Sequence, residues 1–194
     1  MNIDEIAKKM VSKGRGILAA DESTGTMDKR LKSVNIESSV ENRLNFRETL
    51  FSSKSMRENI SGVILFDETI RQRASNGESI PELITKNGSI PGIKVDKGGK
   101  FLAGSNNEKI TEGLDGLRER MDEYYKIGAR FAKWRAIISI SKNNPSMQCI
   151  KSNAHALARY AAIVQEANMV PIVEPEVLMD GDHTIDKCLD VTSR

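Results

Sequence analysis

The stretch Val170–Glu176, VPIVEPE, decides the fold class, because an apolar run stops there at two carboxylates that bracket a proline. Other short apolar runs in the chain also stop at charged side chains. Together they predict five strands, near residues 16–22, 62–68, 92–97, 129–138 and 171–176. Segments with helical periodicity lie between the runs, and this alternation is typical of βαβ units with a parallel sheet.

The helical segments are recognised by apolar residues that recur on one face. Their expected inner faces are Val40, Leu44, Arg47 and Leu50–Phe51; Ile80, Leu83 and Ile84; Leu114, Leu117, Met121 and Tyr124–Tyr125; and, after Pro145, Ile150, Ala154, Leu157, Ala161 and Val164. The first residues, MNIDEIAKKMVSKG, predict a short amphipathic helix and not a signal peptide.

Two α/β architectures fit five strands of this spacing: an open doubly wound sheet, or a (β/α)8 TIM barrel truncated to about its first five βα units. A doubly wound sheet usually has a glycine-rich phosphate turn after its first strand. Here the corresponding stretch, AADESTG, has a single glycine, so the dinucleotide fingerprint is absent. We therefore expect residues 1–194 to form a single incomplete barrel domain.

Composition excludes several classes of function. The 194 residues carry 29 basic and 27 acidic side chains, a formal charge of +2, which argues against a nucleic-acid or membrane partner. No apolar run approaches the roughly 20 residues that span a bilayer. Two cysteines without metal-type spacing indicate a reducing compartment, so we expect a cytoplasmic protein.

Charged residues gather at the ends of the predicted strands, where barrels carry out their chemistry. Residues two apart on a strand share a face. The charged groups are Asp21–Glu22, Asp67–Glu68, Lys94 with Asp96 and Lys97, Lys133 with Arg135, and Glu174 with Glu176. Any one pair could be a solvated strand end or a structural ion pair. Five such ends in succession favour a functional site.

These side chains suit one kind of chemistry. Lysine and arginine bind an anionic substrate such as a sugar phosphate. A cation beside a lysine lowers the pKa of that lysine and makes it available as a Schiff-base nucleophile, while carboxylates move the protons. A metal site is not expected, since Asp180–His183, DGDH, is typical of a turn and helix cap. Ser23 fits either a helix N-cap or, with Arg30, an anion site.

Seven motifs give the sequence a family resemblance. They are GRGILAADESTG, GVILFDET, GIKVDKG, GLDGLRER, GARFAKWR, ARYAAIVQEANMVPIVEPEVL and DGDH, and they run from about Lys13 to the end of the chain. The sequence resembles class I, Schiff-base-forming fructose-bisphosphate aldolase. The resemblance implies a (β/α)8 barrel that reversibly cleaves fructose 1,6-bisphosphate to dihydroxyacetone phosphate and glyceraldehyde 3-phosphate, a step of glycolysis, without a cofactor or metal.

The resemblance also implies roles for individual residues. Asp21 resembles the carboxylate that handles the substrate hydroxyl proton during carbon–carbon cleavage, and Glu174 the general acid/base of the imine steps. Lys133 resembles the lysine beside the nucleophile, with Glu176 in the same charge network. The residues that resemble substrate or phosphate contacts are Ser23, Arg30, Lys94 and Arg135.

One expected residue is missing from these motifs. The Schiff-base lysine of the family lies on the sixth strand, whereas this sequence ends in what is expected to be the fifth crossover helix, which carries Lys187. We therefore expect the chain alone to be inactive. The alternatives are a non-catalytic truncated barrel that binds anionic metabolites or serves in assembly, and another sugar-phosphate lyase on the same barrel. For the complete enzyme the resemblance implies a homotetramer.

Overall fold

The computed structural model describes all residues, 1–194, and its central element is a five-stranded sheet in the order β1-β2-β3-β6-β7. Every neighbouring pair of strands is parallel. Consecutive strands are therefore neighbours, as in a (β/α)8 barrel, whereas a doubly wound sheet reverses its order. This confirms the predicted fold class. The strands are β1 (Gly16–Ala20), β2 (Ile60–Leu65), β3 (Ile90–Lys94), β6 (Phe131–Ile138) and β7 (Val170–Val177).

The first three strands end two or three residues before the predicted ends at 22, 68 and 97. As a result Asp21 and Asp96 lie in the loops that follow β1 and β3, and Asp67 opens a helix. The carboxyl ends of parallel strands lie at one edge of the sheet, here called the carboxyl end. Although the strands end earlier than predicted, these residues still lie at the carboxyl end, and their backbone lies outside the strands.

The sequence did not predict a hairpin that follows β3. Its strands, β4 (Gly99–Phe101) and β5 (Lys109–Thr111), are antiparallel. Asn153 fixes the hairpin to a helix, because its Nδ2 donates to the Lys109 carbonyl (2.9 Å) and its Oδ1 accepts from the Thr111 N–H (3.3 Å).

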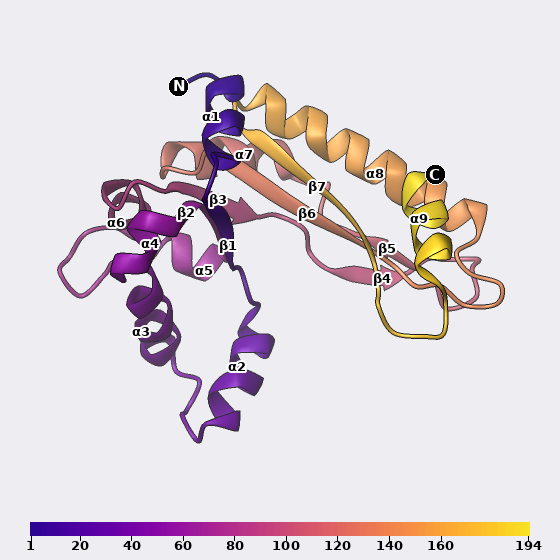
Figure 1. Cartoon of the computed structure of the whole chain (residues 1–194), viewed down its shortest axis with the longest axis horizontal. Helices are drawn as coiled ribbons and strands as arrows, with labels where there is room; N and C mark the ends of the chain where they lie inside the picture. Colours follow the sequence, from indigo (N-terminus) through magenta and orange to yellow (C-terminus); the bar gives the residue numbers. More distant parts are fainter.

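Helices connect the strands, and the longest, α8, lies along β6 and β7 (Figure 1). None of them is long and apolar enough to cross a membrane. They are α1 (Ile3–Met10), α2 (Thr24–Ser33), α3 (Val40–Phe51), α4 (Lys54–Asn59), α5 (Asp67–Ile70), α6 (Ile80–Lys86), α7 (Leu117–Lys126), α8 (Met147–Glu166) and α9 (Ile185–Ser193).

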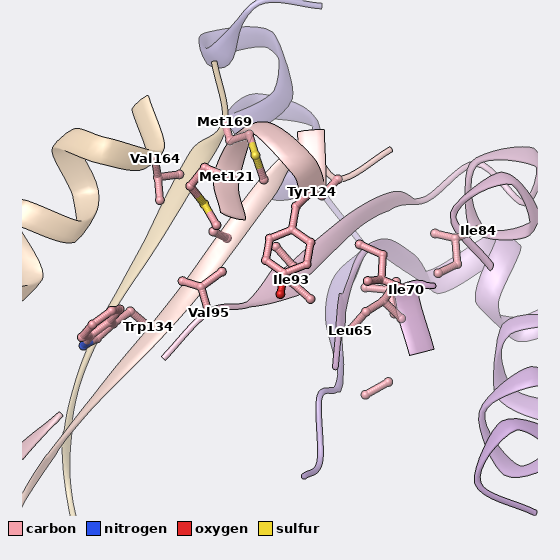
Figure 2. Packing of buried hydrophobic residues seen from close by; sticks show 14 of the residues in the cluster. Leu65, Ile70, Ile84, Ile93, Val95, Met121, Tyr124, Trp134, Val164 and Met169 are labelled. Atoms are coloured by element: carbon pink, nitrogen blue, oxygen red, sulfur yellow. The ribbon is translucent and has the colours of Figure 1, made fainter. Parts of the chain in front are cut away.

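The two faces of the sheet have different cores, because side chains alternate along each strand. The outer face, which meets the helices, carries Leu65, Val95 and Trp134 in a cluster of 24 buried residues (Figure 2). The inner face carries Ile64 and Phe131, which pack against Ile6 and Met10 of α1. Helix α1 thus covers the amino end of the inner face, and the charged residues occupy its other end.

Helix α3 corrects the predicted inner face. Val40 is 57% exposed and Leu50 is also exposed, whereas Arg43, Arg47 and Phe51 are buried. Residues four apart share a helix face, so the buried stripe runs through positions 43, 47 and 51. The prediction placed Leu44, Arg47 and Phe51 on the inner side correctly. It wrongly included Val40 and Leu50, and it left out Arg43, which is buried against polar partners.

Candidate active site

Three charged residues, two from strands and one from the loop after β1, meet at the carboxyl end of the sheet. The Lys133 Nζ lies 3.3 Å from Asp21 Oδ2 and 3.3 Å from Glu174 Oε2. Lys133 is on β6, Glu174 is on the neighbouring β7, and Asp21 follows β1, from which β6 is separated by β2 and β3. The sheet must therefore curl, so that the end of β1 faces β6 across the inner side.

The alternation of side chains along β6 explains how Lys133 reaches this position. Phe131, Lys133 and Arg135 point to the inner face, and Trp134 points outward, where its ring packs against Tyr160 of α8 with centroids 5.4 Å apart. Trp134 therefore serves core packing. Lys133 itself is buried, so its ammonium depends on the two carboxylates for compensation.

Arg135 and Glu176 form a second ion pair, one step further along the same face. The Arg135 N–H also faces Asp96 Oδ2 at 3.5 Å. In the strand register Arg135 lies opposite Glu174, so the second pair adjoins the Lys133 cluster. Both side chains of the pair are more than a third exposed, and pairs of this kind add little to stability. They are therefore available to exchange partners with a bound anion.

Lys94 and Ser23 lie in one cavity of about 640 Å³, which Phe66 and Tyr124 also line. Lys94 makes no ion pair, and its Nζ lies 6.0 Å from the centroid of the Phe66 ring. Burial, followed by a hydrogen bond to Asp67, raises the pKa of Tyr124 to about 12, so this phenol stays neutral. Lys94 is thus a cation of this cavity without a direct ion pair, and Asp67, Asp96 and Glu123 also line the cavity.

The structure gives Ser23 the N-cap position of α2, where its hydroxyl accepts from the Thr26 N–H at 3.4 Å. This cap and an anion site at the same hydroxyl are compatible, because the oxygen has further lone pairs. Arg30, on the next turns of α2, pairs with Glu22 and does not contact the Lys133 cluster.

Two of the predicted strand-end residues take part in other contacts. Asp67 bonds Arg71 Nε (2.9 Å) and the Tyr124 hydroxyl (2.7 Å), and Glu68 bonds Arg43. The charged strand ends therefore do not all form one ion-pair cluster, because this pair contacts Arg71, Tyr124 and Arg43. They open helix α5, which directs their side chains toward neighbouring helices.

Sequence reasoning placed Arg47 on the inner face of its helix but missed the buried Arg43 behind the site and the hydroxyl of Thr69 that Arg47 binds. The only available signal was the four-residue spacing of Arg43, Arg47 and Phe51 along α3. The stretch Asp180–His183 forms the loop before α9, and Thr184 is the N-cap. No group of three or more His, Cys, Asp and Glu side chains is arranged to hold a metal ion.

A curled parallel sheet with lysine and carboxylates at its carboxyl end places the chain in the class of (β/α)8-barrel enzymes. Comparison with known proteins defines the family. The family described as glycolytic fructose-bisphosphate aldolase class-I matches residues 2–194. The chain belongs to the class-I fructose-bisphosphate aldolase family.

The individual proteins that the chain resembles are also fructose-bisphosphate aldolases. A probable fructose-bisphosphate aldolase class 1 of Xanthomonas campestris is 56% identical over 97% of this chain, and cytosolic fructose-bisphosphate aldolase 5 of Arabidopsis thaliana is 56% identical over 96%. The aldolase of Plasmodium falciparum, solved in complex with TRAP and a small-molecule inhibitor, superposes with a TM-score of 0.94 over 97% of this chain, at 48% identity. The chain spans 52–56% of the length of these relatives, about half.

Proposed function

We propose that residues 1–194 supply the acid–base part of a site that cleaves fructose 1,6-bisphosphate to dihydroxyacetone phosphate and glyceraldehyde 3-phosphate through a lysine Schiff base. The observation that carries the proposal is the position of Lys133, whose Nζ lies 3.3 Å from the carboxylates of both Asp21 and Glu174. A buried cation between two carboxylates at the carboxyl end of a barrel sheet is suited to proton transfer during sugar-phosphate cleavage.

Each of the three residues has a distinct part. Asp21 accepts the proton of the substrate hydroxyl when the carbon–carbon bond breaks. Glu174, which is more exposed than Asp21, donates and accepts the protons of carbinolamine and imine formation. The Lys133 ammonium holds both carboxylates in place, and its charge would lower the pKa of a nucleophilic lysine placed beside it.

The phosphates bind to the surrounding cations. Lys94 has no carboxylate partner and lies with Ser23 in the cavity of about 640 Å³. Arg135 and Arg30 are each paired with a glutamate, Glu176 and Glu22, so a phosphate must replace the carboxylate at these positions. Exposed ion pairs contribute little net stability, so the exchange costs little at the Arg135–Glu176 pair, whereas the Glu22 side chain is only 11% exposed.

The nucleophilic lysine comes from outside residues 1–194, and the chain by itself has no turnover. Lys187 is not a substitute, because it lies on α9 and pairs with Asp190 at 2.9 Å. For the complete enzyme we infer a homotetramer, as the family resemblance implies. We infer a cytoplasmic location from the Arabidopsis relatives that are described as cytosolic.

Calorimetric titration of the chain with fructose 1,6-bisphosphate tests the proposal. We expect saturable binding that is roughly tenfold weaker in Lys133→Met, which leaves two unpaired carboxylates facing the substrate, and absent with unphosphorylated fructose. Lys151→Met, which changes an exposed lysine of α8, is the matched control and should bind as the unsubstituted chain does. Equal binding by Lys133→Met and Lys151→Met, or no binding by the unsubstituted chain, would contradict the proposal.

A further inference from the structure

Arg47 is a fully buried charged residue that does not belong to the Lys133 cluster. Its NH1 donates to Thr69 Oγ1 at 2.7 Å, and its NH2 donates to the Glu22 carbonyl at 2.6 Å, with Glu22 Oε2 3.7 Å away. Burial lowers the pKa of this guanidinium, and the charge of Glu22 opposes that effect. A buried charge is costly unless its partners are fixed, so these contacts define where the neighbouring segments lie.

Through its hydrogen bond to the Glu22 carbonyl, Arg47 holds the backbone of the residue that directly follows Asp21. Strand β1 is an edge strand with β2 as its one neighbour, so its carboxyl end is held by the sheet on one side only. Arg47 reaches this end from α3 and joins it to Thr69, which is itself fully buried on α5. The guanidinium thus supplies the second attachment that the sheet does not give.

We propose that Arg47 is a positioning residue, which holds the Glu22 carbonyl against Thr69 and thereby keeps the Asp21 carboxylate at Lys133. Arg47 touches none of the reacting groups, so its effect on chemistry passes through Asp21 and rests on the function proposed above. A planar guanidinium is required, because two of its nitrogens must donate in different directions at the same time.

Arg43 provides a matched control on the same helix. It is also buried, and it forms a two-point contact with Glu68, with Nε to Oε1 at 2.9 Å and NH2 to Oε2 at 2.5 Å. It therefore holds the segment after β2, and its other hydrogen bonds go to Ser38, just before α3, and not to Asp21 or Glu22. Replacing either arginine removes a buried guanidinium from α3, but only the loss of Arg47 should move the Asp21 carboxylate.

The test uses the chain with isotope-labelled lysine, in which the Lys133 side-chain resonance is assigned by its loss in Lys133→Met. Asp21→Asn gives the shift that accompanies loss of the Asp21–Lys133 pair. We expect Arg47→Met to move the Lys133 resonance in the same direction and to weaken binding of fructose 1,6-bisphosphate about tenfold. Arg43→Met should destabilise the fold but leave the resonance and the affinity unchanged.

Arg47→Lys keeps the test decisive if Arg47→Met does not fold. Lysine retains the charge but cannot bridge Glu22 and Thr69, so the Lys133 resonance should lie between those of the unsubstituted chain and Asp21→Asn. An unchanged resonance in every Arg47 variant that folds, or an equal shift in Arg43→Met, would overturn the inference. A chain that binds no bisphosphate would contradict the proposed function, whereas the resonance would still report whether Arg47 positions Asp21.

Discussion

At the scale of single residues, the arginines determine which carboxylates remain free for chemistry. Glu22, Asp67 and Glu68 are each bound to an arginine, whereas Asp21 and Glu174 share one lysine. An arginine–carboxylate contact can be two-pronged and fixes both groups, while a lysine ammonium is a point charge around which carboxylates can exchange protons and partners. In the proposed function this difference separates the carboxylates that move protons, Asp21 and Glu174, from those that an arginine holds, which include Glu176.

The Arg43–Glu68 pair leads to a prediction on pH. Hydrogen bonds from Arg43 hold the pKa of Glu68 below its ordinary value of 4.5, against the opposing effect of burial. Because the unfolded chain binds the proton more readily, this pair stabilises the fold above pH 4.5, and the stabilisation is lost as the pH falls through the lower, folded pKa.

We therefore expect Glu68→Gln to lower the free energy of unfolding by about 1–3 kcal/mol at neutral pH. The difference between Glu68→Gln and the unsubstituted chain should shrink as the pH falls below 4.5. Urea unfolding of both chains across this pH range gives the measurement. A difference that stays constant with pH would contradict the assignment.

At the scale of the elements, apolar periodicity was enough to predict the parallel strands and the helices that follow them, because the outer face of the sheet and the helix stripes are apolar. The hairpin Gly99–Thr111 was missed because its strands are three residues each and lie in a glycine-rich segment. The stripe of α3 was predicted only in part, without Arg43, because the partners of Arg43 and Arg47 lie about 25 residues away in sequence, which local spacing cannot reveal.

Contacts between residues far apart in sequence also limited the prediction of the site. Polar strand ends predicted where Asp21, Lys133 and Glu174 lie, since the carboxyl ends of parallel strands meet at one edge. The distances depend on how far the sheet curls, and the attachment of Arg47 to Glu22 depends on the packing of α3. Neither can be read from the residues around Asp21.

One prediction concerns the packing of the inner face beneath the site. The Phe131 ring lies directly over Gly92, where an added Cβ would lie 2.2–2.4 Å from ring atoms. Gly92→Ala should therefore displace the ring and cost about 1–3 kcal/mol of unfolding free energy. Gly25→Ala in α2, where an added Cβ meets nothing within 4 Å, is the matched control and should be neutral or slightly stabilising.

Urea unfolding of the two variants measures the difference. Adding Phe131→Leu to Gly92→Ala should recover part of the loss, because the smaller side chain makes room for the methyl group. Equal stability of the two single variants would show that the Phe131 ring does not pack tightly against Gly92.

At the scale of the whole molecule, residues 1–194 contain five parallel strands whose inner face carries charge at one end and an apolar core at the other. The two edge strands, β1 and β7, each have one neighbour in the sheet. The relatives are about twice as long as this chain. The division of labour proposed here therefore places proton transfer in these residues and the nucleophile in a segment that follows them.

Borohydride trapping with dihydroxyacetone phosphate tests this division most directly. The ketone and a lysine amine lose water to form an imine, which hydride and a proton convert to a stable secondary amine that mass spectrometry detects. We expect no adduct on the 194-residue chain. We expect one adduct on a hybrid in which residues 1–194 are followed by the remaining length of the Xanthomonas campestris relative, located on a lysine of the added part. A stoichiometric adduct on Lys133, or on any other lysine of residues 1–194, would contradict the central claim.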